Sequence, residues 1–234
     1  MNILAIECTH GVLGIGLLHG GAVRDMRGAA WQKTAESIVP LIDRIMMDAG
    51  ALPGSLDAVA VSSGPGSFTA LRIGMSVAKG VACGLGIPVV PVPTLPSMAA
   101  SLPSGFGAEA VMAVVESRKG EYYYSVFRTA DLAAFRWDAP VERGGAEAVL
   151  AELASHPHAT AVVGRHLEPL QDALLAGGAR VVGADFFTAA ALFPMAGRLL
   201  STGGGADAGS VVPDYHQEFV SGSTQVGPGG VGGK

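Results

Sequence analysis

The turn Gly64-Pro65-Gly66-Ser67 follows an apolar run and holds residue types that could do chemistry. Backbone N–H groups at the start of a helix can bind an anion, and the Ser67 hydroxyl could cap that helix or serve as a nucleophile. No Gly-Lys-Ser or Gly-Lys-Thr ending follows, and the sixth position is Thr69, so the turn is neither a P-loop nor a dinucleotide-binding motif. No Gly-x-Ser-x-Gly elbow surrounds Ser67. We therefore favour a structural strand-to-helix turn over an anion-binding or catalytic one.

The histidines and cysteines show no spacing typical of a metal site. No two of the six histidines lie four residues apart, and no His-Glu-x-x-His pattern occurs. The six are His10, His19, His156, His158, His166 and His216. Cys8 falls in a predicted strand and Cys83 in a predicted helix, where small buried side chains are more common than ligands or disulfides. We predict no bound metal.

The turn lies inside a predicted strand–helix–strand unit. An apolar run over 58–61 reads as a strand, the pattern from 68 to about 84 is helical, and 86–92 is extended again. Small residues recur at every fourth position of the helix and form one ridge, made of Ala70, Gly74, Ala78 and Ala82. Such a ridge allows close approach of either the chain's own sheet or a partner helix. We favour packing inside the chain.

The order of predicted elements occurs twice. The first set has strands over 2–7, 12–18 and 21–27 and an amphipathic helix over 34–50, followed by the unit described above. The second set has strands over 111–116, 120–128, 134–137 and 160–163 and helices over 146–155, 167–175 and 188–200. Two βββαβα repeats predict a duplicated, two-lobed α/β fold. We expect an N-terminal lobe over 1–103, a C-terminal lobe over 104–220 and a disordered tail over 221–234.

The composition narrows the class of protein. The 234 residues are 49% hydrophobic, carry a formal charge of −5, and have a mean hydropathy of +0.41. No uninterrupted apolar stretch approaches the ~18 residues of a membrane span, and the N-terminus lacks the features of a signal peptide, so we expect a cytoplasmic protein. Beyond Arg118-Lys119 no basic cluster occurs, so we do not expect the chain to bind tRNA by itself.

The segment GPGSFTALRIG at 64–74 resembles the signature GPGSFTGLRIG of the TsaB (YeaZ) family, with Ala70 in place of a glycine. The resemblance implies a non-catalytic partner subunit of TsaD, the enzyme that completes threonylcarbamoyladenosine in tRNAs reading ANN codons. It also implies the duplicated actin-like fold (ASKHA, ribonuclease H-like). The implied partners are TsaD, the ATPase TsaE and a second copy of the chain, with tRNA contacted only through the complex. No cofactor of its own is implied, since ATP is used by the partner proteins.

The same resemblance marks a degenerate phosphate site. Actin-like ATPases have an aspartate at the end of the first strand. The TsaB (YeaZ) family has a segment similar to Asp-Thr-Ser at this position, whereas this chain has Glu7-Cys8-Thr9. Glu7 projects one methylene further and Cys8 lacks a hydroxyl, while Mg²⁺ demands near-ideal octahedral geometry. We therefore expect no ATP hydrolysis by this chain alone.

The two helices of the first repeat are the expected interface with partners. Their apolar and small side chains suit a helical contact. The candidate interface residues are Ile38, Ile42, Met46, Ala70, Gly74, Met75, Ala78 and Ala82. Two alternatives stay open. One is an independent actin-like ATPase, kinase or peptidase, and the other is a homodimeric binding module for a different protein.

Overall fold

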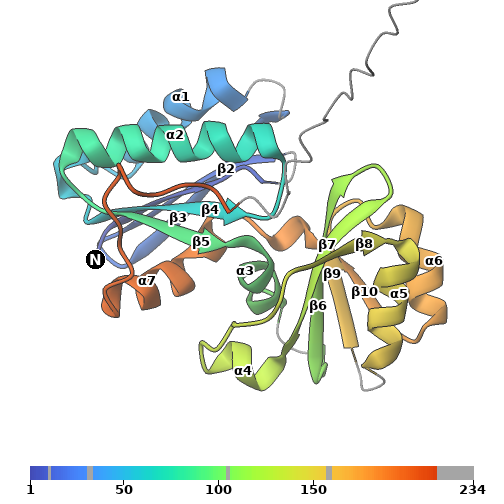
Figure 1. The fold of residues 1–234 in the computed structure, drawn as a ribbon. Coiled ribbons are helices and arrows are strands. Elements are labelled where there is room, and N and C mark those ends of the chain that lie inside the picture. Colours follow the sequence, from blue (N-terminus) through green and yellow to red (C-terminus); the bar gives the residue numbers. More distant parts are fainter. Residues whose placement is uncertain (10–11, 31–33, 104–105, 157–159, 215–234) are drawn as a thin grey trace, which may run out of the picture.

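The structure is a computed structural model that describes residues 1–9, 12–30, 34–103, 106–156 and 160–214. The predicted disordered tail over 221–234 lies outside the described residues. Within them the chain forms two lobes, each built on a five-stranded mixed sheet (Figure 1).

The first sheet has the strand order β3-β2-β1-β4-β5. Strands β1, β2 and β3 pair antiparallel as two hairpins, and β1, β4 and β5 pair parallel. The strands are β1 (Ile3–Glu7), β2 (Val12–His19), β3 (Ala22–Ala30), β4 (Ala58–Gly64) and β5 (Val89–Pro93). The helices of this lobe are α1 (Thr34–Asp48), the short 3-10 helix η2 (Pro53–Ser55), α2 (Phe68–Leu85) and α3 (Thr94–Ala100).

The second sheet repeats the first. Read from its other edge, its order is β8-β7-β6-β9-β10, with the same two antiparallel and two parallel pairings. The strands are β6 (Ala110–Arg118), β7 (Glu121–Arg128), β8 (Glu142–Gly145), β9 (Thr160–Gly164) and β10 (Arg180–Gly183). The helices are α4 (Thr129–Ala133), α5 (Ala146–Ser155), α6 (Glu168–Ala176), the 3-10 helices η3 (Ala184–Phe186) and η4 (Ala189–Leu192), and α7 (Phe193–Ser201). The duplicated α/β fold predicted from the sequence is confirmed.

Three apolar cores hold the layers together. Side chains alternate between the faces of a strand, so β1 contributes Leu4 and Ile6 to the core beneath α1 and α2, and Ile3 and Ala5 to the opposite core. That opposite core lies between the two sheets and includes residues of α3 and α7. A third core joins the second sheet to α5 and α6, which cover its outer face in Figure 1. The two lobes are therefore joined by a shared apolar interior.

Two predicted elements of the second lobe are corrected by the structure. The expected strand over 134–137 is a loop, because Phe135 has a left-handed φ of 54° and Ala134 terminates α4. The third strand of this lobe is β8, a few residues later. The expected helix over 188–200 is divided into the 3-10 helix η4 and α7, which begins at Phe193 with Pro194 in its first turn.

The chain after β10 returns to the first lobe. Helix α7 contacts β5, and η4 contacts β1 and β2. The following residues, 203–214, form a C-terminal strap along β5 and α2, in which Ala206 bridges Val89 and Asp214 donates its N–H to the Ser63 carbonyl at 2.8 Å. The strap shields the edge of the first sheet, since an unpaired edge strand invites association with other chains.

Helix α2 is, among the described residues, the one helix whose length and apolar composition would allow it to cross a membrane. Its inner face packs against the first sheet, and the helix also carries Arg72 and Lys79. The Lys79 ammonium donates to the carbonyl of Val211 in the strap at 3.0 Å. These are the contacts of a core helix in a folded lobe.

Candidate functional site

The candidate site lies where the two lobes face each other. The turn after β4 and the turn after β9 occupy equivalent positions in the two repeats, since each leads from the second parallel strand into a helix. Together with the segment after β1 and the end of β6, they enclose a cavity of about 350 Å³. Its lining residues are Thr9, Ser67, Phe68, Thr69, Glu116, Ser117, Arg165 and His166. The cavity thus combines hydroxyls with both signs of charge.

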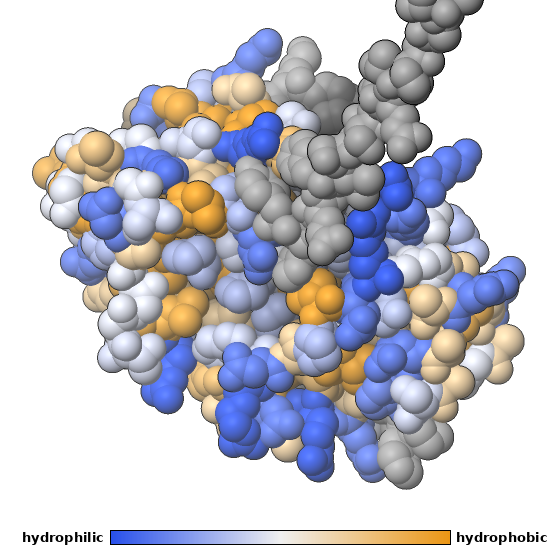
Figure 2. Space-filling view, viewed as in Figure 1, coloured by the Kyte–Doolittle hydropathy of each residue, from blue (hydrophilic) through white to orange (hydrophobic). Residues whose placement is uncertain are grey.

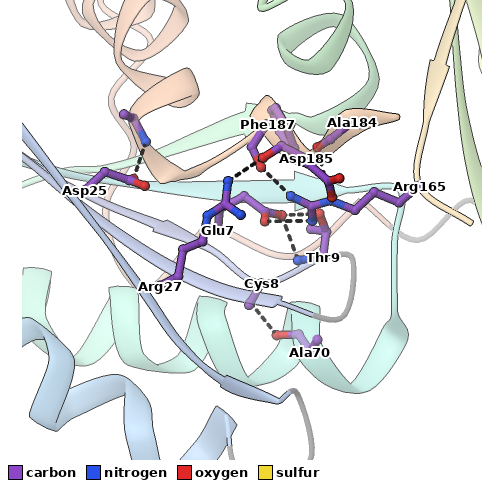
Figure 3. A network of polar contacts seen from close by, with 11 residues as sticks. Glu7, Cys8, Thr9, Asp25, Arg27, Ala70, Arg165, Ala184, Asp185 and Phe187 are labelled. Carbon is purple, nitrogen blue, oxygen red and sulfur yellow. Dashed lines mark hydrogen bonds and ion pairs between the residues drawn. The ribbon is translucent and has the colours of Figure 1, made fainter. Parts of the chain in front are cut away.

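Glu7 is the central acid of this region and is only 1% exposed. Its Oε1 accepts hydrogen bonds from the Thr9 backbone N–H at 2.8 Å and from the Thr9 hydroxyl. Its Oε2 lies 3.7 Å from Nη1 of Arg165, a residue of the other lobe (Figure 3). A buried carboxylate needs such partners, because burial without them would cost several kcal/mol.

Arg165 contacts both lobes in this region. Its Nε donates to the Ala184 carbonyl at 3.2 Å and its Nη2 donates to the Phe187 carbonyl, while Nη1 faces Glu7. The side chain is 9% exposed. Sequence reasoning missed this residue. Arg165 follows Gly164 after β9 as Pro65 follows Gly64 after β4, but a proline at the equivalent position gives no signal of the role of an arginine.

The donor set around Glu7 does not fit a metal-bridged nucleotide. Mg²⁺ requires an octahedron of oxygens with open positions for water and phosphate. Here the Glu7 carboxylate is already hydrogen-bonded to Thr9 and faces a guanidinium. No cluster of three or more His, Cys, Asp or Glu side chains able to hold a metal occurs in the described part of the chain.

Cys8 lies behind the acid, on the α2 side of β1. Its thiol donates to the Ala70 carbonyl at 3.0 Å, and burial, followed by the neighbouring Glu7 charge, raises the pKa of this thiol far above its ordinary value. The expectation of a small buried side chain is confirmed for Cys8. For Cys83 it is wrong, because that thiol is exposed on the outer face of α2.

The Gly64–Ser67 turn is held closely by its neighbours. A Cβ on Gly66 would lie 2.6 Å from Cβ of Thr9, and one on Gly64, whose φ is 122°, would lie 2.8 Å from the Asp214 carbonyl oxygen. Ser67 donates its N–H to the Thr9 carbonyl at 3.0 Å, and its side chain makes no capping hydrogen bond. The glycines are therefore required for close packing, which supports a structural role for the turn.

The candidate interface residues occupy a different place from the one expected. All eight are buried within the chain, in the core between α1, α2 and the first sheet. The inner ridge of α2 (Ala70, Gly74, Ala78 and Ala82) faces the sheet, and a Cβ on Gly74 would lie 2.5 Å from Sγ of Cys8. The expected interface is therefore wrong for the inner ridge of α2, whereas Ile42 and Met46 also line the groove described below. All eight residues stabilise the lobe, because their apolar surface is already removed from water.

The surface that α1 and α2 leave exposed is also apolar. Met47 and Leu52 are 69% and 74% exposed, and Figure 2 shows apolar side chains at the upper edge of the first lobe. A groove of about 520 Å³ runs between the two helices, and we call it the α1–α2 groove. It is lined by Val39, Ile42, Asp43, Met46, Met47, Ala51, Pro53, Leu56, Gly80, Val81, Gly84 and Leu85. Of these residues, Gly80 and Gly84 form an exposed outer ridge on α2 together with Ser76.

Comparisons with known proteins agree with the sequence signature. A family model described as TsaD: tRNA N6-adenosine threonylcarbamoyltransferase matches residues 28–134. The tRNA threonylcarbamoyladenosine biosynthesis protein TsaB of Haemophilus influenzae is 33% identical over 125 residues, which cover 53% of this chain and 53% of that protein. The protein of the same name from Escherichia coli is 32% identical over 128 residues, covering 55% of each. The chain thus matches these curated relatives over about half of their length.

A solved structure shares the whole architecture. It is described as an uncharacterized protein with similarity to peptidase YeaZ from Pseudomonas aeruginosa, and its TM-score is 0.75. The match covers 92% of this chain and 99% of that chain at 22% sequence identity. At this identity the likeness establishes the fold, and the predicted two-lobed actin-like architecture is confirmed.

Proposed function

We propose that this chain is a member of the TsaB (YeaZ) family and a non-catalytic subunit in the synthesis of threonylcarbamoyladenosine in tRNA. The names of its curated relatives support the pathway, because both are threonylcarbamoyladenosine biosynthesis proteins. In this proposal the chain works in the cytoplasm and supports TsaD, which transfers the threonylcarbamoyl group, with the ATPase TsaE as a third component.

The observation that carries the non-catalytic role is the pairing of Glu7 with Arg165. In a metal-dependent ATPase of this architecture, the carboxylate at the end of the first strand must be free to act on a metal-bound nucleotide. Here it accepts two hydrogen bonds from Thr9 and faces a guanidinium. The chain accordingly needs no cofactor of its own, and ATP is consumed by its partners.

The α1–α2 groove is the proposed contact with TsaD or with a second copy. Its lining is mostly apolar, and neither Gly80 nor Gly84 has an atom within 4 Å of the position that a Cβ would take. A partner helix could approach this backbone closely, with large apolar side chains in the groove. With a net charge of −5, the chain would reach tRNA only through such a complex.

Co-purification with TsaD of the same organism tests the proposal. Gly80→Arg and Gly84→Arg place a charge in the proposed contact, and their side chains point into open space in the isolated chain, so both variants should fold. We expect each to weaken TsaD binding by roughly tenfold or more, or about 1.4 kcal/mol. Ala78 is unsuitable for this test, because it is fully buried and an arginine there would disrupt the lobe.

Gly197→Arg is the matched control. Gly197 also lies in a helix with no atom within 4 Å of its would-be Cβ, but on α7, away from the groove. It should bind TsaD as the unmodified chain does. If the α2 variants fold and bind equally well, the groove is not the contact. If the unmodified chain does not bind TsaD, and tRNA of a deletion strain keeps its threonylcarbamoyladenosine, the proposed function is wrong.

A further inference from the structure

Arg165 lies at the centre of the contacts that join the two lobes. It extends from the turn after β9 in the second lobe, and its Nη1 faces the carboxylate at the end of β1 in the first. We propose that its guanidinium is a built-in cation that keeps the interlobe cleft closed without any ligand. Arg165 is then a positioning residue that occupies the place beside Glu7 where a cation bound to that carboxylate would lie.

The backbone contacts of Arg165 extend this role. Its Nε and Nη2 donate to the carbonyls of Ala184 and Phe187, in the segment that leaves the second sheet and returns to the first lobe. Both residues are fully buried in the core between the sheets. One planar group therefore fixes the acid of one lobe and the connecting segment of the other, which a lysine with its single nitrogen could not do in the same geometry.

The first lobe holds the same connecting segment from its other side. Asp25 accepts a hydrogen bond from the Ala190 N–H at 3.0 Å, and an Arg27 guanidinium N–H donates to the Asp185 carbonyl (Figure 3). Segment 184–190 is thus clamped between β3 and Arg165. Loss of the Arg165 guanidinium would release segment 184–190 on one side only. We therefore expect faster local opening of this segment and a less stable contact between the two lobes.

The position of Arg165 between two cavities makes the proposal testable by chemical rescue. Arg165 and His166 line both the 350 Å³ cavity described above and a second cavity of about 510 Å³ at the ends of β9 and β10. Removing the side chain would connect the two spaces beside Glu7. A small guanidinium ion could then enter and replace the missing group, with the same planar donors facing the carboxylate and the two carbonyls.

The experiment uses the purified full chain and needs no partner, so its result is independent of the proposed function. Thermal unfolding of Arg165→Ala should begin at a temperature lower by roughly 10 °C, because the buried Glu7 carboxylate and two backbone carbonyls lose the guanidinium that they contact. Millimolar methylguanidinium should raise the Tm of this variant and leave that of the unmodified chain unchanged. Methylammonium and Mg²⁺ at the same concentration should have little effect, since neither offers the planar set of donors.

Arg143→Ala is the control, because Arg143 also forms an ion pair, with Glu121 on the surface, at 2.6 Å. Methylguanidinium should not raise the Tm of Arg143→Ala. Amide hydrogen exchange of 184–190 should be faster in Arg165→Ala and should slow again when methylguanidinium is added.

The proposal is overturned if Arg165→Ala has the same Tm as the unmodified chain. It is also overturned if the variant folds but methylguanidinium does not stabilise it, or if Mg²⁺ raises its Tm as much as methylguanidinium does. If Arg165→Ala does not fold, the proposal is tested by comparing the double variant Glu7→Gln with Arg165→Met against Arg165→Met alone. The proposal requires this double variant to fold with a higher Tm than Arg165→Met alone, because glutamine removes the buried negative charge that the Arg165 guanidinium faces. Equal destabilisation in both would mean that Arg165 acts only through packing.

Discussion

Alanine at two glycines of α2 should change the stability of the chain in opposite directions. Helix propensity alone favours alanine over glycine by about 1 kcal/mol at either site. At Gly80 the new methyl group meets nothing within 4 Å, so this gain should be kept in full. At Gly74 the methyl carbon would lie 2.5 Å from Sγ of Cys8, well inside the contact distance of the two atoms.

The expected magnitudes follow from these distances. Overpacking a core costs about 1–3 kcal/mol, which exceeds the gain in propensity, so Gly74→Ala should be less stable than the unmodified chain. Gly80→Ala should be more stable by about 1 kcal/mol, or roughly 2–4 °C in Tm for a chain of this length. Urea unfolding followed by far-ultraviolet circular dichroism measures both differences.

A double-mutant cycle identifies the cause. In a Cys8→Ala background the sulfur is absent, so Gly74→Ala should lose much less stability than it does in the unmodified chain. The reasoning is refuted if Gly74→Ala stabilises the chain as much as Gly80→Ala does. That result would mean that the face with Gly74 does not pack against Cys8.

Three further outcomes follow from the structure. A thiol reagent should modify Cys83 in the native chain and reach Cys8 only after denaturation, because Cys8 is buried with a raised pKa; two modified thiols in the native state, measured by mass spectrometry, would contradict this. Truncation after Gly203 should lower the Tm and promote association by exposing the edge of β5, whereas truncation after Asp214 keeps the strap and should do neither, as size-exclusion chromatography would show. Burial raises the pKa of Asp25 above its ordinary value of 3.8, so the native state holds more protons than the unfolded state between the two values. The free energy of unfolding should therefore fall as the pH rises through that interval, and Asp25→Asn should flatten this part of the profile.

Most elements of the fold could be predicted from local patterns. The helix over 146–155 and the start of α2 at Phe68 have the predicted bounds, because apolar periodicity and a glycine turn are properties of neighbouring residues. The prediction of a strand at 134–137 was wrong. Four residues with two aromatic side chains are too few for the alternation of apolar and polar residues to distinguish a strand from the loop that follows α4. The short β10 was missed for a similar reason.

The candidate site could be predicted in part. The Gly64–Ser67 turn was recognised by its place after an apolar strand, whereas Glu7 and Thr9 were identified through the resemblance to the TsaB (YeaZ) family. Arg165 was not, because its role depends on contact with residues that are distant in the sequence and meet only when the two lobes pack together.

The sequence by itself determined that the chain is a duplicated α/β protein, with Glu7 after its first apolar run and small residues along α2. It could not determine which small ridge is core, because Gly74 and Gly80 belong to two ridges with the same four-residue spacing. Only the tertiary structure decided this, by placing the first sheet and Cys8 against one ridge and leaving the other exposed. The physical reason is that helical periodicity defines the faces of a helix, while burial depends on which face the rest of the chain removes from water.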